Sequence, residues 1–500
     1  MKRHVLAVLM AVMMLVSLLP ADALAGMCED GTCSHKAAIG DEHFETLQAA
    51  VDSIEGTQET TIRLLGSCEG DGVIVGPTDG GKNIVFDFGG ETYTISGRLV
   101  GSRGTETNGF QLLKGNSVTF RNGTLTTTSD AVGNIVENGV YRDVQGSAKI
   151  LIQNYGNLTF EDMQLSGGSE TEMVSSNNCG VVKILGSTSI HNNGKTAMDA
   201  CYWPASNDTY IAGTQVTVNT TGTIDGDIEL GIYGTNGSVS GWETIPTILT
   251  VESGTILGNI STYTAVVGAY RTGHTAEENA AKAKAMFVVK GGTFKDIAPA
   301  LEAGAPGAIV TLADNLEIER PIVTENPVTL NLNEKVLTNH HRMNSAADRF
   351  SLLAKADLTI ENGTYISSKA EDIGDTDTRG ICANGGSLTL RNAVIESDGV
   401  NICLYADGKE LNIENCQISG LYAVASFAEN GKVKITDSEL TASEQGLYHN
   451  GSYAGAVLNV SGTAISGGTD AANPDHKGVY ISGSQDTTNR AGKNQQATFT

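Results

Sequence analysis

One short pattern comes round four times in the last third of this chain, and it limits the possible folds more than any other feature. Its copies are LTLRNAVI (388–395), LNIENCQI (411–418), VKITDSEL (433–440) and LNVSGTAI (458–465), which begin 23, 22 and 25 residues apart. Apolar residues fill the first, third and eighth places, and polar residues fall between them. Near the middle stands a turn-prone residue: Asn392, Asn415, Asp437 or Gly462. The alternation predicts a strand, a tight turn and a second strand.

A recurrence of this length is typical of a solenoid, in which each repeat buries its apolar face against its neighbours. The repeat holds two strands and leaves no room for a helix, so it favours an all-β, right-handed parallel β-helix. Inward side chains would stack at about 4.8 Å from one coil to the next. Asn, Asp and Gly suit the turn because they tolerate left-handed backbone, and a file of them can hydrogen-bond along the axis.

Related octets occur upstream at wider intervals. They are VTFRNGTL (118), LTFEDMQL (158), LTVESGTI (249), FVVKGGTF (287) and LTIENGTY (358). The wider intervals indicate loop and helix excursions from the coils, at 199–210, which holds Trp203, and at 274–286. Such excursions often form the functional surface of a rigid scaffold.

Residues 1–25 have the pattern of a secretory signal peptide. A basic start (Lys2, Arg3) precedes an apolar run at 5–19 and a small-residue site at 23–25. This pattern predicts cleavage after Ala25 and a secreted or cell-surface protein. No later apolar run approaches the roughly 18 residues of a membrane span, so no transmembrane segment is expected.

The next part, residues 26–58, combines a cysteine-containing segment with a short helix. Leu47, Val51 and Ile54 fall on one face of that helix, which we expect to cap the open end of the solenoid. Two β-helical modules follow, at 59–307 and 308–500.

The division into two modules comes from an internal echo. The run at 61–95 returns in shortened form at 308–337, with the same order of strands and acidic turns. The echo predicts that the first module ends near Gly307, where the second begins.

The octets and the signal peptide together resemble the pectate-lyase-like right-handed β-helix superfamily. The opening AAIGDEHFETLQAAVDSI (37–54) also looks like the start of secreted or surface β-helix proteins of Gram-positive gut bacteria. The resemblance implies the fold across nearly all of the mature chain. Enzymes of the superfamily imply further motifs, such as paired aspartates with a Gly-His-Gly segment, but this chain has Gly273-His274-Thr275 and no such set.

The formal charge of −25 at pH 7 bears on the choice of partner. A surplus of carboxylates argues against nucleic acid and anionic membranes, and it is compatible with cations or neutral glycans. We expect a monomer whose partner is a polysaccharide or a glycan of a host or cell-wall surface.

Three carboxylates form the best acidic constellation. Asp225, Asp227 and Glu229 alternate along GTIDGDIELG (222–231), so they would face one side of a strand. Calcium bridging them, acid–base chemistry and a solvated outer face are all compatible with this pattern. A second acidic group, Asp372, Asp375 and Asp377, lies in a loop and is a weaker calcium candidate, for which a plain polar loop is the alternative.

Three tyrosines mark a possible glycan-binding face. Tyr422, Tyr448 and Tyr480 each follow a Gly and an aliphatic residue, as though they began equivalent strands. If the aliphatic residue points inward, the tyrosines form an outward file that stacks on sugar rings, with Trp203 as a further candidate. The alternative is a file that only stabilises the solenoid through cross-strand contacts.

Two cysteine pairs have the spacing of the repeat. Cys179 and Cys201 are 22 residues apart, and Cys382 and Cys403 are 21 apart. In an exported chain each pair can form a disulfide between adjacent coils, or can consist of small buried residues.

These observations favour a non-catalytic, adhesin-like β-helix module that presents a long face to glycans or host macromolecules. One alternative is a diverged polysaccharide lyase or glycoside hydrolase, carried by Asp225, Asp227 and Glu229. A purely structural surface stalk is the other.

Overall fold

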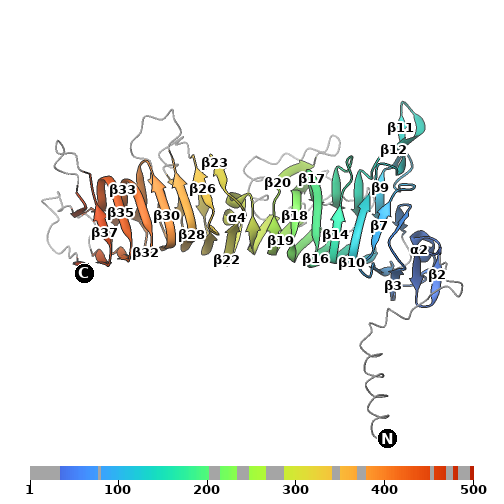
Figure 1. Ribbon diagram of the computed structural model, residues 1–500, viewed down its shortest axis with the longest axis horizontal. Coiled ribbons are helices and arrows are strands. Elements are labelled where there is room, and N and C mark those ends of the chain that lie inside the picture. The colour runs from blue at the N-terminus through green and yellow to red at the C-terminus, as the bar shows by residue number, and fades with distance from the viewer. Residues whose placement is uncertain are drawn as a thin grey trace, which may run out of the picture. The chain divides into compact units, whose positions relative to one another are not determined.

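The computed structural model describes residues 34–76, 80–201, 214–233, 247–265, 286–340, 350–368, 379–450, 455–468, 477–481 and 496–500. The predicted signal peptide and the cysteines of residues 26–33 lie outside this range. The described part is all-β, as the octets predict, with most strands paired in parallel (Figure 1). Its helices α2 (Leu47–Ser53) and α4 (Ile297–Glu302) are short, and none of the helices among these residues has the length and hydrophobicity needed to cross a bilayer.

The chain divides into two compact units, residues 1–175 and 176–500. The module boundary expected near Gly307 falls inside the second unit. There, β21 (Phe287–Phe294) pairs with β22 (Gly304–Leu312), and β22 pairs with β25 (Val328–Asn331), so strand pairing continues across that position.

The strands of the first unit are β1 (Ala37–Ile39), β2 (Glu42–Phe44), β3 (Glu59–Leu64), β4 (Cys68–Gly70), β5 (Val73–Val75), β6 (Asn83–Asp87), β7 (Thr92–Ile95), β8 (Thr105–Glu106), β9 (Asn108–Leu112), β10 (Ser117–Thr127), β11 (Val132–Glu137), β12 (Val140–Gln145), β13 (Ile150–Asn154) and β14 (Asn157–Ser166). Strand β15 (Met173–Asn177) spans the division between the units.

A column of aromatic side chains fills the core of the first unit. Strands β3, β6, β10 and β14 pair in parallel, so that Ile62, Phe86, Phe120 and Phe160 are successive register partners. All four side chains are buried. The Phe86 and Phe120 rings stack with centroids 5.0 Å apart, and the Phe120 and Phe160 rings lie 5.9 Å apart. The octets at 118 and 158 therefore pair in register, as their spacing predicts.

Helix α2 forms where the sequence predicts it. Thr46 caps its N-terminus by accepting a hydrogen bond from the Ala49 amide, and Leu47 and Val51 are each 1% exposed. The Lys82 ammonium donates to the Val51 carbonyl at 2.7 Å, which satisfies a backbone group at the C-terminal end of the helix. The helix packs against β1, β2, β3 and β5, and thus covers the first strands.

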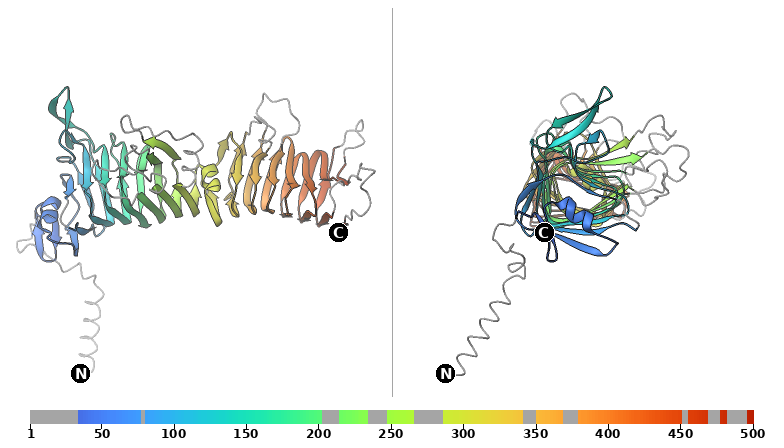
Figure 2. Two further views of the ribbon diagram at one scale, coloured as in Figure 1. Left: turned by 180° about the vertical axis from the view of Figure 1, so that it is seen from behind. Right: turned by 90° about the vertical axis from the view of Figure 1, so that its right-hand side faces the viewer.

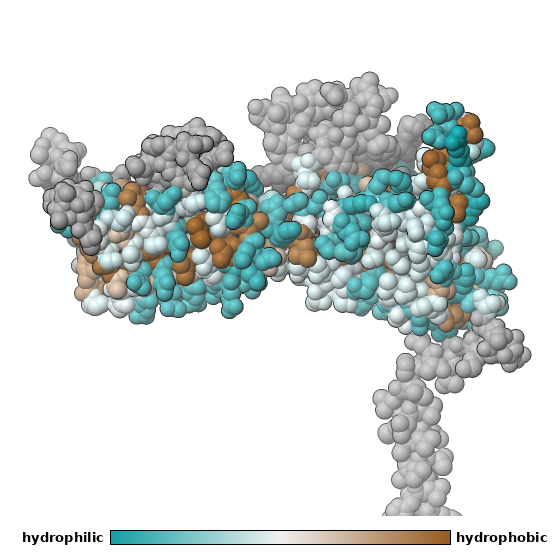
Figure 3. Space-filling model, turned by 45° about the horizontal axis from the view of Figure 1, so that its top comes forward, coloured by the Kyte–Doolittle hydropathy of each residue, from teal (hydrophilic) through white to brown (hydrophobic). Residues whose placement is uncertain are grey.

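A small antiparallel sheet of β8, β11 and β12 projects from the first unit (Figure 2). The two-residue turn Asn138-Gly139 has positive φ at both positions, the geometry that suits a tight hairpin. Val136, Val140 and Tyr141 are about half exposed, and hydrophobic surface is visible on this hairpin in Figure 3. Neither the octets nor the resemblance predicts this sheet.

The strands of the second unit are β16 (Gly180–Gly186), β17 (Ser189–Ala200), β18 (Thr214–Tyr233), β19 (Thr247–Ile256), β20 (Ile260–Ala265), β21 (Phe287–Phe294), β22 (Gly304–Leu312), β23 (Leu316–Ile318), β24 (Ile322–Thr324), β25 (Val328–Asn331), β26 (Val336–Asn339), β27 (Phe350–Ala354), β28 (Leu358–Ser367), β29 (Arg379–Ala383), β30 (Leu388–Ser397), β31 (Val400–Ala406), β32 (Glu410–Glu414), β33 (Gln417–Ala428), β34 (Lys432–Thr436), β35 (Glu439–His449), β36 (Val457–Ser461), β37 (Ala464–Ser466), β38 (Val479–Ile481) and β39 (Gln496–Phe499).

The four octets of the last third pair in the predicted register. Their first residues, Leu388, Leu411, Val433 and Leu458, are successive parallel partners, and the third and eighth residues follow the same rule. These four first residues are at most 1% exposed. The apolar places of the repeat therefore form the dry core of this unit.

The turn residues adopt the left-handed backbone that the sequence predicts. Asn362, Asn392, Asn415, Asp437 and Gly462 have φ between 48° and 60°. The Asn415 amide donates to Asn392 Oδ1 at 2.8 Å, and the Asn392 amide donates to Asn362 Oδ1 at 3.4 Å. A file of asparagine side chains thus runs across successive repeats, and we refer to it as the asparagine file.

Candidate functional site

The second unit carries a line of aromatic side chains that is longer than the predicted tyrosine file. We refer to Phe350, Tyr405, Phe427, Tyr448 and Tyr480 as the aromatic ladder. Successive ring centroids lie 6.5, 6.3, 5.5 and 5.7 Å apart, and the Tyr448 and Tyr480 rings are parallel within 6°. These separations are typical of favourable ring contacts.

The strand register shows that one of the three predicted tyrosines, Tyr422, is not aligned with the other two. Tyr448 and Tyr480 are direct parallel partners, as expected. Tyr422 instead aligns with Gln445, because a β-bulge after Gly420 shifts the register of β33. Its ring still reaches that of Tyr448, with centroids 5.7 Å apart, so Tyr422 flanks the ladder instead of forming a step of it.

Small side chains make room for the large rings. Leu353, Cys382, Cys403, Ala425, Tyr448 and Tyr480 are successive register partners and form one column. The rings of Phe350, Tyr405 and Phe427 pack against the small, fully buried Cys382 and Cys403. The next member of this column after Ala425 is Tyr448, and its ring is itself part of the ladder.

The ladder is partly open to solvent. Phe350 is 9% exposed, whereas Tyr405, Phe427, Tyr448 and Tyr480 have intermediate exposure. The aliphatic residue before each tyrosine is predicted to point inward, and Leu447, which precedes Tyr448, does so. Val479 is the register partner of Leu447 and so faces the same side, although it is 37% exposed.

Three ladder members were missed from the sequence: Phe350, Tyr405 and Phe427. A signal for two of them was present, since Tyr405 and Phe427 are 22 residues apart, which matches the repeat. Phe350 carries no such signal, because it lies before the part of the chain in which the octets recur at regular intervals.

The carboxylates of β18 alternate with buried residues, as predicted. Asp225, Asp227 and Glu229 are partly exposed, while Ile228 and Leu230 are fully buried. The pairing with β17 is interrupted within this row. The register shifts between the pairs His191–Asp225 and Thr196–Asp227, at Gly226, whose φ is 139°.

Other residues of the chain already bind the first two of these carboxylates. Asp225 Oδ2 lies 2.7 Å from Nδ1 of His191 on β17, and His191 Nε2 lies 2.9 Å from Asn193 Oδ1. Asp227 Oδ1 accepts hydrogen bonds from the backbone and side chain of Asn259, at 2.8 and 3.2 Å. His191 was missed from the sequence because it is 34 residues from Asp225, and only strand register brings the two together.

Within the described residues, no three His, Cys, Asp or Glu side chains come together as a metal site. Asp225, Asp227 and Glu229 therefore do not converge on one point as a calcium site would require. The other calcium candidates, Asp372, Asp375 and Asp377, lie outside the described residues, as does Trp203.

One of the two cysteine pairs lies where the repeat spacing places it. Cys382 and Cys403 are register partners on neighbouring parallel strands, and both are fully buried thiols. Cys179 and Cys201 are also buried, and the Cys201 amide donates to the Asn177 carbonyl at 2.9 Å. A disulfide within either pair stays a prediction.

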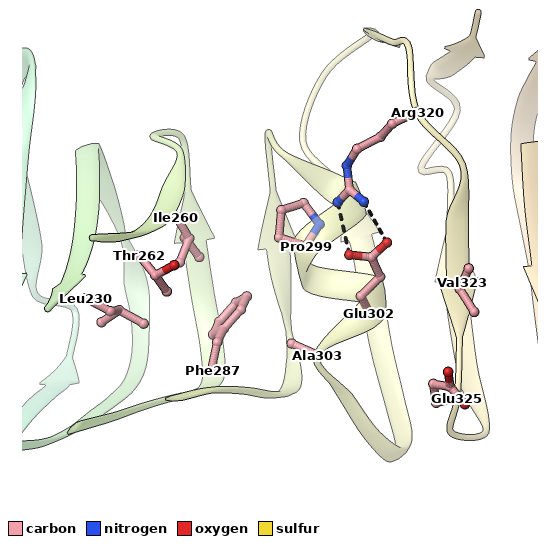
Figure 4. Close-up of a pocket in the computed structure, with 10 residues that line it drawn as sticks. All are labelled: Leu230, Ile260, Thr262, Phe287, Pro299, Glu302, Ala303, Arg320, Val323 and Glu325. Carbon is pink, nitrogen blue, oxygen red and sulfur yellow. Dashed lines mark hydrogen bonds and ion pairs between the residues drawn. The ribbon is translucent and has the colours of Figure 1, made fainter. Parts of the chain in front are cut away.

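The second unit also has clefts of ligand size, and one of them is mainly apolar. A cleft of about 470 Å³ lies beside α4, lined by Leu230, Ile260, Thr262, Phe287, Pro299, Glu302, Ala303, Arg320, Val323 and Glu325 (Figure 4). No motif in the sequence indicates it.

Comparison with known proteins does not assign a function to these sites. No protein-family model matches the chain, and no curated protein sequence matches it.

Proposed function

We propose that this chain is a right-handed parallel β-helix, exported to the cell surface or beyond, which binds glycans through the aromatic ladder without catalysing a reaction. The observation that supports the fold is the in-register parallel pairing of successive octets at intervals of one coil. The observation that supports glycan binding is the ladder itself, which places four partly exposed rings in one line.

The chemistry of the ladder suits sugars better than other partners. Pyranose rings have apolar C–H faces that stack on aromatic rings, and tyrosine hydroxyls at the rim can hydrogen-bond to sugar hydroxyls. Three of the five ladder rings are tyrosines: Tyr405, Tyr448 and Tyr480. Neighbouring parallel strands are about 4.8 Å apart, so the ladder offers a repeating platform to an extended chain. The charge of −25 favours a neutral glycan over an anionic one.

The experiment is a glycan array with purified protein, comparing the wild type with the double variant Tyr448→Ala/Tyr480→Ala. Loss of two stacking rings should weaken binding roughly 10- to 100-fold. Tyr141→Ala is the matched control, since Tyr141 is a 48% exposed aromatic residue on the first unit and outside the ladder. Full binding by the double variant would contradict the proposal.

The enzyme alternative has one observation in its favour, the contact between His191 and Asp225 at 2.7 Å. A carboxylate that orients an imidazole is a common element of acid–base catalysis. We assign it a structural role, because Asn193 engages the second ring nitrogen. New reducing ends or unsaturated products that appear on incubation with a retained glycan, and disappear with Asp225→Asn, would favour the lyase or hydrolase. A protein that retains no glycan at all would favour the stalk.

A further inference from the structure

The cleft beside α4 exists because a helix interrupts a series of strands. Strand β20 pairs with β18, and β24 pairs with β27, so strands occupy this side of the second unit before and after the interruption. The segment that follows β21 forms α4 instead of a strand. Because a helix does not fill the place of a strand, a cleft of about 470 Å³ remains, within the usual range for small-ligand sites.

The floor and walls of the cleft are mainly apolar. Leu230 is fully buried and Phe287 is 8% exposed, and Ile260 and Val323 complete the apolar surface (Figure 4). Helix α4 directs its own apolar residues into the core and leaves Pro299 on the side of the cleft. These groups match the C–H face of a ligand better than a charged head group.

One polar pair stands at this apolar surface. Arg320 donates two hydrogen bonds to the Glu302 carboxylate, at 2.7 and 3.1 Å. Their side chains are 46% and 30% exposed, so both have remaining hydrogen-bonding capacity toward the cleft. A hydroxyl group fits this pair because it can accept from the guanidinium and donate to the carboxylate at once. A simple anion or cation can satisfy only one of the two.

The surrounding charges also disfavour an anion. Asp296, at the N-terminus of α4, interacts electrostatically with both Arg320 and Glu302. Glu325 lines the cleft and pairs with Lys355 at 3.0 Å. Two ion pairs and one additional carboxylate leave the region slightly negative, so a carboxylated or sulfated ligand would be repelled.

We propose that the cleft beside α4 binds a neutral sugar unit, with its apolar face on Phe287 and Pro299 and its hydroxyls on the Glu302–Arg320 pair. This site is separate from the aromatic ladder and does not depend on it. The expected ligand is a mono- or disaccharide, since the cleft of about 470 Å³ has the usual volume of a small-ligand site.

The test is saturation-transfer NMR followed by calorimetry on the full chain. Neutral probes are glucose, galactose, N-acetylglucosamine, cellobiose and lactose, and charged comparators are glucuronate and n-butylamine. At least one neutral probe should bind, and Glu302→Gln and Arg320→Met should each weaken it at least 10-fold. The matched control is Glu252→Gln, which breaks a comparable surface pair with Lys290 at 2.9 Å outside the cleft.

Three results would overturn the proposal. One is that no neutral probe binds; another is that a charged comparator binds more tightly than all of them; the third is that both variants bind like the wild type. Ala303→Met provides a second route, because it fills the cleft without changing a charge and should also abolish binding. Thermal melting of each variant shows whether it is folded. The Tyr448→Ala/Tyr480→Ala variant should keep full affinity for these probes, which separates this site from the ladder.

Discussion

Asn415 offers the sharpest test of the turn geometry. Its φ is 52°, and its side chain donates to Asn392 at 2.8 Å. Alanine in left-handed backbone costs roughly 1–2 kcal/mol, and loss of the hydrogen bond costs about 0.5–1.5 kcal/mol. The midpoints of the two ranges add up to about 2.5 kcal/mol, so we expect Asn415→Ala to lower local stability by roughly 2–3 kcal/mol. Glycine avoids the backbone strain but loses the bond and some entropy, so Asn415→Gly should cost roughly 1–2 kcal/mol.

The assay is amide hydrogen exchange of the segment 411–418, read by mass spectrometry, because a repeat protein can open locally. Exchange should accelerate roughly 30- to 150-fold in the alanine variant and roughly 5- to 30-fold in the glycine variant. Gln417→Ala, an exposed change in the same segment, should stay within about 0.5 kcal/mol of the wild type. If alanine proves as stable as glycine, the left-handed assignment at Asn415 is wrong.

Three further changes test other parts of the structure. Leu411→Asp places a charge at a fully buried position of the repeat and should abolish the cooperative melt followed by circular dichroism; an unchanged melt would refute the inward assignment. Phe120→Ala removes the centre of the aromatic column in the first unit and should cost about 3–5 kcal/mol in urea unfolding. Burial holds the pKa of the fully buried His449 below its ordinary value of about 6.5, so the unfolded chain takes up a proton first. The free energy of unfolding should therefore keep its full value above that pH and fall below it. His449→Leu should make the free energy of unfolding depend less on pH in this range. Equal slopes of unfolding free energy against pH for the variant and the wild type would contradict this prediction.

The repeat made much of the fold predictable. Apolar residues at the first, third and eighth places of the octet can be buried together only if successive copies align, and Leu388, Leu411, Val433 and Leu458 do align. The left-handed turns follow from the same pattern, since few residues other than Asn, Asp and Gly tolerate that backbone.

The sites were less predictable, because they depend on interruptions of the repeat. A bulge after Gly420 displaces Tyr422 from the register of the other tyrosines, and a register shift at Gly226 interrupts the pairing of the carboxylate row. Helix α4 leaves a cleft whose lining residues span almost a hundred positions from Leu230 to Glu325. Periodicity says nothing about where a repeat fails.

The asparagine file has a direction. Each amide donates toward the N-terminal neighbour, from Asn415 to Asn392 and from Asn392 to Asn362. An ionised carboxylate has no proton to pass on, so Asp437 cannot donate to Asn415, and Gly462 has no side chain at all. The chain of aligned amide dipoles therefore stops at Asn415. The repeats on the C-terminal side of Asn415 lack this side-chain link, so we expect their turn amides to exchange hydrogen faster than those on its N-terminal side.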